Sequence, residues 1–273
     1  MILSTYATSI QADLYAPFAS AARAHDVPFV IGEANSVSCG GQENVSDTFA
    51  ATLWGIDYLA SMSKIGVEMI NFHGSRSPYS PLYCPYNSST HAQVEVKPLY
   101  YAQLVHGEIA PAVNTSWVHT SSSVLGANSV AHATVNTSSG HITVAIVMKS
   151  QSQPLTSTGT TNVTVSLKNW NSTCSKTGRK CIPSRVRLAR LSVPLAHDTA
   201  SRLAAKDGIE YAGMTFDKSR DGHPIGRRTE ERLRTLPGPG GSGLFVTFST
   251  TQASAVVLFF ECAAAAQGEV GSN

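Results

Sequence analysis

Charged residues are scarce in this 273-residue chain, at 14% against the roughly 25% usual in globular domains. Lysine and arginine (20 in total) nearly balance aspartate and glutamate (18), so the formal net charge is +2. This balance argues against a dedicated nucleic-acid-binding protein, which would carry a strongly basic face. No apolar run reaches about 18 residues, so we expect no membrane span. Hydrophobic residues make up 42%, enough for a sizeable buried core.

The first residues lack both a basic region and a long apolar segment, so they do not form a secretory signal peptide. Asn-x-Ser/Thr glycosylation sequons nevertheless favour a secreted or extracellular full-length protein. The five cysteines are odd in number, which requires at least one free or externally paired thiol. Cys174 and Cys181 either close a short local loop or remain unpaired. The six sequons lie at Asn44, Asn87, Asn114, Asn136, Asn162 and Asn171.

Residues 1–110 alternate between helical and buried-strand patterns. Short continuous apolar runs at 27–32 and 67–72 are typical of parallel strands covered on both faces. Helices that alternate with strands indicate βαβ connectivity, and hence a parallel sheet. The expected helices span residues 11–25, 46–64 and 98–108.

The helical patterns also predict which side chains face the core. In the first helix Leu14, Phe18 and Ala21 or Ala22 form one stripe. In the second helix we expect Ser46 to cap the N-terminus and Gly66 to end the helix. The expected inner face of the second helix consists of Phe49, Leu53, Ile56, Leu59 and Met62.

From Pro111 onward the pattern is all-β. Short Val/Thr/Ser-rich strands alternate with turn residues, which predicts an antiparallel β-sandwich. The Gly/Pro-rich and charged segment 217–243 indicates a long hairpin loop or partial disorder. The expected strands span residues 141–149, 161–167, 185–193, 243–250 and 254–261.

Polar residues follow both predicted parallel strands. Glu33 comes directly after the first strand, and Asn71 and His73 lie at the end of the second. Functional groups of α/β folds gather at the carboxyl ends of such strands. Glu33 is therefore a candidate catalytic carboxylate; the alternative is a carboxylate that caps a loop or pairs with a base.

Several short strings stand out in the first 110 residues: E-A-N-S from Glu33, G-G at Gly40–Gly41, V-S-D-T-F-A from Val45, D-Y-L from Asp57, and N-F-H-G from Asn71. Together they resemble glycoside hydrolase family 79, which contains β-glucuronidases and heparanase-like endo-glucuronidases. The later string Y-A-G-M-T-F-D is similar to the C-terminal β-domain of that family. The N-F-H-G string is nearer to the glucuronidase branch.

The resemblance implies a fold class of α/β followed by all-β. We expect an incomplete (β/α)8 barrel, reduced to its last two strands and flanking helices, plus an antiparallel β-sandwich. The expected boundaries are 1–110 for the partial barrel, 111–265 for the β-sandwich and 266–273 for a tail. The implied ligand is a glucuronide-containing oligosaccharide or proteoglycan-type glycan, with no cofactor and no metal.

The family mechanism assigns the role of nucleophile to Glu33, which would act with a second carboxyl group about 5 Å away. Backbone N–H groups at Gly40 and Gly41 would approach the glucuronate carboxylate, since glycine permits close approach; a tight turn is the alternative. Tyr79, or Tyr83, would donate a hydrogen bond to the same carboxylate unless it is a packed loop aromatic. The remaining substrate-binding candidates are Asn35 and His73; His73 is otherwise a structural histidine.

Arginine side chains line one predicted strand of the β-sandwich. Arg185 and Arg187 alternate with apolar neighbours, and Arg190 lies close by. This alternation is typical of a solvated strand face. The alternative is a surface that binds an acidic polysaccharide.

The expected general acid is missing from this chain. In this clan it follows an asparagine on an earlier strand, yet no Asn-Glu dipeptide occurs here. We therefore expect the C-terminal part of a longer enzyme, inactive alone, with residues 1–110 poorly settled. The alternatives are a non-catalytic chain whose β-sandwich binds a glycan or a partner, and a subunit that complements a separate N-terminal half.

Overall fold

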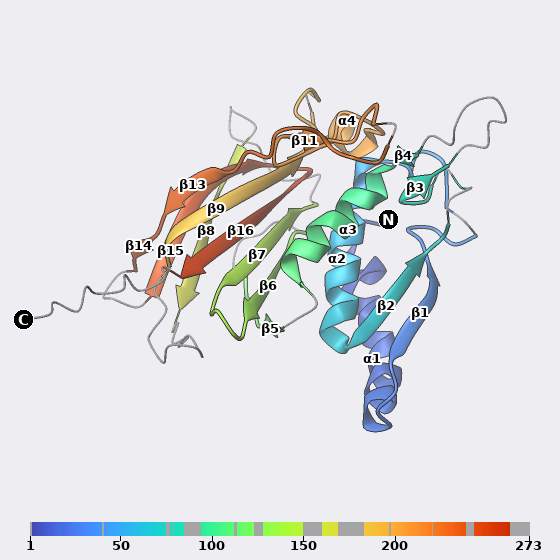
Figure 1. The fold of residues 1–273 in the computed structure, drawn as a ribbon, viewed down its shortest axis with the longest axis horizontal. Coiled ribbons are helices and arrows are strands. Elements are labelled where there is room, and N and C mark those ends of the chain that lie inside the picture. The colour runs from blue at the N-terminus through green and yellow to red at the C-terminus, as the bar shows by residue number, and fades with distance from the viewer. Residues whose placement is uncertain are drawn as a thin grey trace, which may run out of the picture.

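The computed structural model consists of layers of sheets and helices packed side by side (Figure 1). A small parallel sheet lies at one side, helices lie in the middle, and two antiparallel sheets form the other side. The structure describes residues 2–39, 41–74, 77, 79–84, 94–111, 114–122, 128–149, 160–168, 183–196, 198–219, 221–238 and 243–262.

The parallel sheet consists of β1 (Phe29–Ala34) and β2 (Val67–Phe72), which confirms the two predicted parallel strands. Ile31 is buried against the helices. On the other face Val30 and Met69 are partners in the register and are 40% and 56% exposed. Parallel sheets are normally covered on both faces. The described residues cover only one face of this pair.

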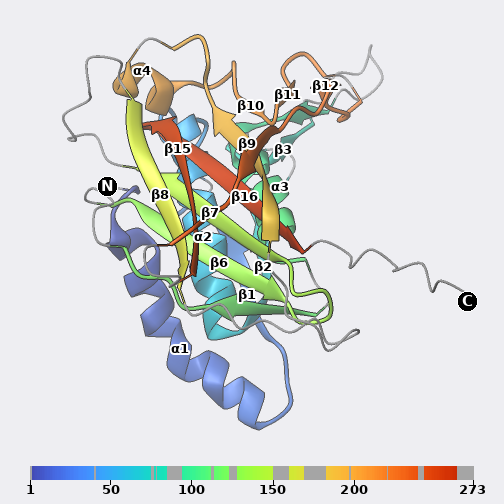
Figure 2. The same ribbon diagram turned by 90° about the vertical axis from the view of Figure 1, so that its left-hand side faces the viewer.

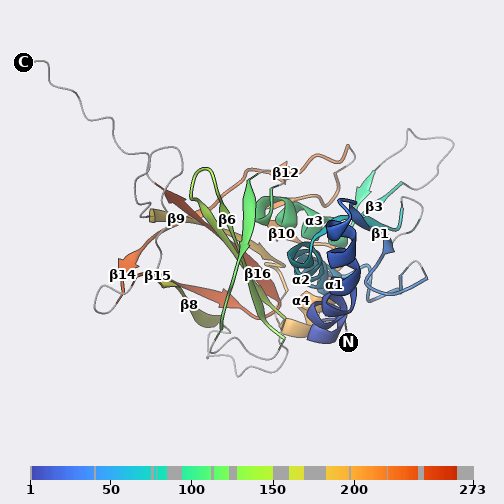
Figure 3. The same ribbon diagram turned by 90° about the horizontal axis from the view of Figure 1, so that it is seen from below.

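The three predicted helices are present as α1 (Ser9–Ala24), α2 (Phe49–Ile65) and α3 (Pro98–Ile109), and a short 3-10 helix, η1 (Thr5–Ala7), precedes them. Nearly all of α2 is buried, because it lies between the parallel sheet and the large antiparallel sheet (Figure 3). Gly66 ends it in the left-handed conformation with φ 96°, as predicted. Among the described helices, none is long and apolar enough to cross a membrane.

The prediction that Ser46 caps α2 is wrong. Thr48 holds the N-cap position in extended conformation. The Ser46 hydroxyl instead accepts a hydrogen bond from the Gln42 N–H at 2.9 Å and bonds the Ser36 hydroxyl at 2.7 Å. The helix begins three residues later than expected because Ser46 serves the loop before it.

The predicted core stripe of α1 is also wrong. Leu14 and Phe18 are each 63% exposed, whereas Ala12 and Ala19 are buried. The small alanine side chains let this face of α1 pack closely on the rest of the molecule. Figure 2 shows α1 lying along one side of the fold. The Arg23 guanidinium donates to the Ile65 carbonyl at 2.8 Å and so ties the C-terminal ends of α1 and α2 together.

The antiparallel strands form the predicted β-sandwich. The small sheet has the order β14-β15-β8, and the short pair β3 (Leu82–Tyr83) and β4 (Glu95–Val96) lies apart. The large sheet has the order β12-β11-β10-β9-β16-β7-β6-β5, and β13 pairs with β9. The strands are β5 (Thr115–Val118), β6 (Val130–Asn136), β7 (Ile142–Met148), β8 (Thr160–Lys168), β9 (Pro183–Ser192), β10 (Glu210–Tyr211), β11 (Met214–Thr215), β12 (Ile225–Gly226), β13 (Glu231–Arg234), β14 (Leu236–Pro237), β15 (Gly243–Thr251) and β16 (Ser254–Cys262).

Segment 217–243 is not a plain hairpin loop, which corrects the sequence prediction. It contains β12, β13 and β14, and β13 pairs with β9 from Glu231↔Leu188 to Arg234↔Arg185. Ion pairs hold this segment to the helix and to the sheet. Arg228 binds Glu108 of α3, and Glu230 and Glu231 bind Arg187 and Arg190 of β9. Its high charge reflects these ion pairs.

Both faces of the large sheet are buried. On β16, Ala255 and Val257 face the helices, while Val256 and Leu258 face the small sheet. This two-sided burial explains why the central strands read as nearly continuous apolar runs. The core of α2 and α3 continues into the sheet across residue 110, the boundary expected from the sequence.

A buried ion cluster joins α2 to the large sheet. Asp57 of α2 accepts a 2.8 Å hydrogen bond from His132 Nε2 of β6 and also binds Lys149, which follows β7. His132 Nδ1 lies 2.8 Å from Lys64 Nζ. Neutral His132 therefore donates to Asp57 and accepts from Lys64.

Burial and charge shift the pKa values of this cluster. Burial alone would raise the pKa of Asp57, but the hydrogen bond from His132 and the charge of Lys149 hold it well below its usual value. Burial lowers the pKa of His132 by more than the hydrogen bond and the charge of Asp57 raise it. Burial, with the charge of His132, also lowers the pKa of His106 in α3 to about 4. Both histidines are thus neutral at pH 7.

Candidate active site at the edge of the parallel sheet

The carboxyl ends of β1 and β2 bring Glu33 and His73 together. Glu33 lies within β1 and His73 follows β2, where its N–H donates to the Ala34 carbonyl at 3.3 Å. His73 Nε2 lies 3.9 Å from Glu33 Oε1. The side chains are 44% and 68% exposed, so the pair is open to solvent. Glu33 is thus neither locked in a buried ion pair nor turned into the core.

Asn35 organises the loop that follows Glu33. Its Oδ1 accepts a hydrogen bond from the Ser36 N–H at 2.7 Å, and its Nδ2 donates to the Tyr79 carbonyl at 3.4 Å. These bonds link the loop after β1 to the segment after β2. The structure therefore gives Asn35 a role in holding the two loops beside Glu33.

Gly41 and Tyr79 approach each other closely. Gly41 has φ 106°, and a Cβ at this position would lie 2.6 Å from Tyr79 Cβ and 3.0 Å from Ser46 Cβ. Only glycine fits both this conformation and this spacing. The close approach by itself accounts for glycine at position 41. Gly40, the other member of the pair, lies outside the described residues.

Ser46 is a site-organising residue that the sequence analysis assigned to a helix cap instead. Its hydroxyl joins Ser36, after β1, to the backbone of Gln42. The side chain is buried. The sequence shows only a serine shortly before the first helical turn. Such a serine is equally typical of a helix cap and of a residue that anchors a loop.

The same loop is fixed from the β-sandwich side. Asp47 Oδ2 accepts a 2.7 Å hydrogen bond from Lys206 Nζ, and the Phe49 N–H donates to the Ala205 carbonyl at 2.7 Å. Both partners lie at or just after α4 (Thr199–Ala204). The β-sandwich therefore positions the loop that reaches the candidate site.

Tyr83, the alternative to Tyr79, lies in the short hairpin β3–β4. The Lys97 ammonium group sits 5.4 Å from the centre of its ring. Tyr83 is thus engaged within this hairpin, whereas Tyr79 contacts the glycine loop.

The arrangement offers an exposed carboxylate beside an imidazole, next to a loop held by hydrogen bonds. A carboxylate at such an edge can act as a nucleophile or as a general base. In the part of the chain that the structure describes, no cluster of three or more metal-binding side chains occurs. Cys39 on the same loop is an exposed free thiol, and Cys262 is disulfide-bonded.

Comparison with known proteins supports a shared fold at low identity. No protein-family model matches the chain, and no curated protein matches it. A crystal structure of a 4-O-α-L-rhamnosyl-β-D-glucuronidase from Fusarium oxysporum 12S matches with a TM-score of 0.65 and 20% identity. That match covers 94% of this chain and 49% of the glucuronidase. An arabinose-bound GH51 α-L-arabinofuranosidase matches with a TM-score of 0.51 and 11% identity, over 94% of this chain and 36% of that protein.

The chain therefore spans about half the length of the glucuronidase structure that it matches. The layered arrangement of a parallel strand pair, helices and a β-sandwich is common to this chain and to parts of those enzymes. The protein has a glycoside-hydrolase-like fold.

Proposed function

We propose that this chain provides the nucleophile of a retaining β-glucuronidase of the family 79 type, and that Glu33 is that nucleophile. The observation that supports it is the position of Glu33: exposed, at the carboxyl end of a parallel strand, beside His73 from the neighbouring strand. Catalytic residues of barrel enzymes occupy strand ends of this kind. The fold likeness to a glucuronidase agrees with the proposal.

The proposed chemistry has two steps. In the first, a Glu33 carboxylate oxygen bonds the anomeric carbon of the glucuronide, the bond to the leaving oxygen breaks, and a general acid protonates that oxygen. In the second, the general acid, now deprotonated, takes a proton from water; the water oxygen bonds the anomeric carbon, and the bond to Glu33 breaks. The Glu33 side chain is 68% exposed, so a sugar can reach its carboxylate from solvent.

The other candidate residues would position the substrate. His73, 3.9 Å from Glu33, would orient its carboxylate or contact a sugar hydroxyl. Asn35, Gly41 and Tyr79 would form the wall of the subsite, because their mutual contacts hold both loops beside the strand ends.

Hydrolysis of glycans, whose leaving oxygen needs a proton from a general acid, also requires more parallel strands than the described residues contain. The uncovered face of β1 and β2, with Val30 and Met69 exposed, would bind further β/α units that complete a barrel. These units would bring the general acid, for which the sequence offers no Asn-Glu pair. We propose that they come from an N-terminal half, and that the completed protein acts on glucuronide-containing glycans.

A glucuronide whose leaving group needs little protonation can measure the contribution of Glu33 without a general acid. We expect the chain to release dinitrophenol from dinitrophenyl β-D-glucuronide and to leave the phenyl glucuronide unchanged. Loss of a general acid costs about 10²- to 10⁴-fold on poor leaving groups and far less on good ones. Glu33→Gln should abolish the release, and Glu68→Gln, an exposed carboxylate on β2, should retain it. Equal rates for wild type and Glu33→Gln would refute the proposal.

A further inference from the structure

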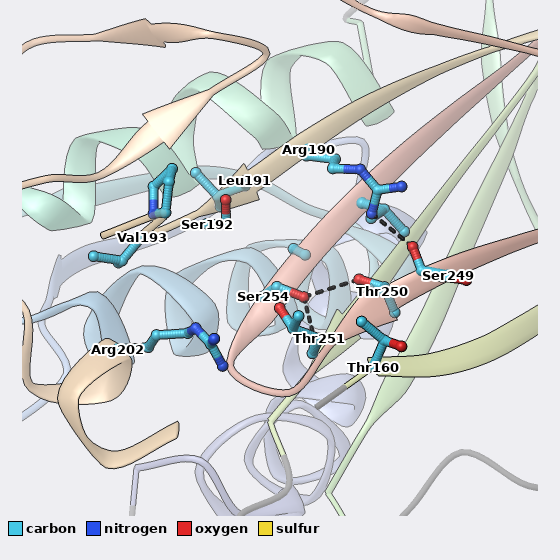
Figure 4. A pocket seen from close by; sticks show the side chains of 13 residues that line it. Thr160, Arg190, Leu191, Ser192, Val193, Arg202, Ser249, Thr250, Thr251 and Ser254 are labelled. Carbon is cyan, nitrogen blue, oxygen red and sulfur yellow. Dashed lines mark hydrogen bonds between the residues drawn. The ribbon is translucent and has the colours of Figure 1, made fainter. Parts of the chain in front are cut away.

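A cavity of about 360 Å³ lies at one end of the β-sandwich (Figure 4). The elements that line it are not the ones that carry Glu33. Strands of both sheets form it: β9 and β16 from the large sheet, and β8 and β15 from the small one. Arg202 of α4 closes one side. Its volume lies within the range of small-ligand pockets.

Hydroxyl groups dominate the polar part of the lining. Thr250 and Ser254 are both buried, and their hydroxyl oxygens lie 3.1 Å apart. Ser254 also donates to the Thr251 carbonyl at 2.5 Å. Since Thr250 and Ser254 come from neighbouring strand ends, these bonds fix the floor of the cavity. Because Ser254 donates to the Thr251 carbonyl, Thr250 donates to Ser254, and the free lone pairs of both hydroxyls can accept hydrogen bonds from the hydroxyl groups of a sugar.

The lining carries positive charge and no acidic side chain. Arg190 is already committed: it binds the Glu231 carboxylate with two nitrogens and donates to the Ser249 carbonyl at 2.8 Å. Arg202 differs: its charge interacts with the exposed N-cap residue Asp198, but none of the described residues accepts a hydrogen bond from its guanidinium group. In Figure 4 this group points toward the turn between β15 and β16. A guanidinium with free N–H groups binds a carboxylate in a bidentate manner.

We infer that this cavity binds one acidic sugar unit of a glycan. Arg202 holds the sugar carboxylate, the buried hydroxyls of Thr250 and Ser254 bond the ring hydroxyls, and the apolar wall at Val193 and Pro194 contacts a ring face. The site is separate from Glu33 and does not depend on hydrolysis. It gives the β-sandwich a binding function for an acidic glycan.

Titration calorimetry with D-glucuronate, D-glucose and acetate tests the inference on the full chain. We expect glucuronate to bind, and glucose and acetate to bind at least about tenfold more weakly, because each lacks either the carboxylate or the hydroxyls. Equal binding of acetate and glucuronate would overturn the sugar assignment. Equal binding of glucose and glucuronate would overturn the role of the carboxylate.

Matched variants locate the site. Arg202→Gln should weaken glucuronate binding about tenfold or more, and Arg185→Gln, an exposed arginine on β9 outside the cavity, should not. Thr250→Val removes one floor hydroxyl at nearly constant volume and should weaken binding while the thermal unfolding midpoint confirms folding. Glu68→Gln, on β2 and outside the cavity, should bind glucuronate as the wild type does. If Arg202→Gln binds glucuronate as tightly as the wild type, the cavity is not the site.

Discussion

Removing the Asp57 carboxylate should strongly destabilise the protein. The Asp57 side chain is 1% exposed, and its partner Lys149 is fully buried. Asp57→Asn leaves the Lys149 ammonium group inside the molecule without a counter-charge, and its amide offers one acceptor oxygen where the carboxylate offers two, to His132 and Lys149. Breaking a buried ion pair from one side costs about 3–5 kcal/mol. Domains are stable by only about 5–15 kcal/mol, so a large part of the stability would be lost.

Urea unfolding at pH 7 measures this loss, followed by fluorescence of Trp54 in α2 and Trp117 in β5. Trp54 lies in the core of α2 and the Trp117 ring lies 6.3 Å from that of His132, so the fluorescence of both should change in one transition. Asp57→Asn should lower the free energy of unfolding by about 3–5 kcal/mol.

A double-mutant cycle separates the ion pair from simple packing. Lys149→Met removes the buried charge and keeps the length of the side chain. The double variant Asp57→Asn/Lys149→Met should then lose less than the sum of the two single variants. Single variants within about 1 kcal/mol of the wild type, or strictly additive losses, would refute the argument.

The remaining predictions concern the neutral histidine and the glycine loop. Because the pKa of His106 is about 4 in the folded protein and 6.5 in the unfolded chain, unfolding takes up protons between these values. Stability should therefore fall by up to about 3 kcal/mol as the pH drops from 6.5 to 4; a slope in urea titrations that His106→Gln leaves unchanged would contradict this. Gly41→Ala should destabilise by about 1–3 kcal/mol, because φ is 106° and Tyr79 Cβ is 2.6 Å away. Gly74→Ala, which meets nothing within 4 Å, should be nearly neutral in the same measurement; equal losses would disprove the close approach.

The strand and helix patterns predicted most of the fold. The runs at 27–32 and 67–72 became β1 and β2, and the stripe from Phe49 to Met62 became the buried α2. These predictions hold because continuous apolar runs and helical periodicity follow directly from burial. The positions of Glu33 and His73 at adjoining strand ends followed from the parallel order alone.

The sequence did not allow prediction of features that depend on contacts between residues far apart in the chain. The stripe of Leu14 and Phe18 has the periodicity of a core face, yet the described structure buries the alanines of α1 instead. Asp57 meets Lys149 only after the sheet packs on α2, 92 residues away in sequence. The strand β13 was hidden in a charged segment, because its Glu231 finds its ion-pair partner, Arg190, on a distant strand, β9.

The most direct test of the proposed role of Glu33 is covalent trapping. A dinitrophenyl 2-deoxy-2-fluoro-β-D-glucuronide reacts with a nucleophile without help from a general acid, and its fluorine slows release of the sugar. Mass spectrometry of the digested chain should find one fluoroglucuronyl group on the peptide that carries Glu33, in the wild type and in Glu68→Gln. No label in the wild type, or a label that persists in Glu33→Gln, would contradict the assignment of Glu33 as the nucleophile.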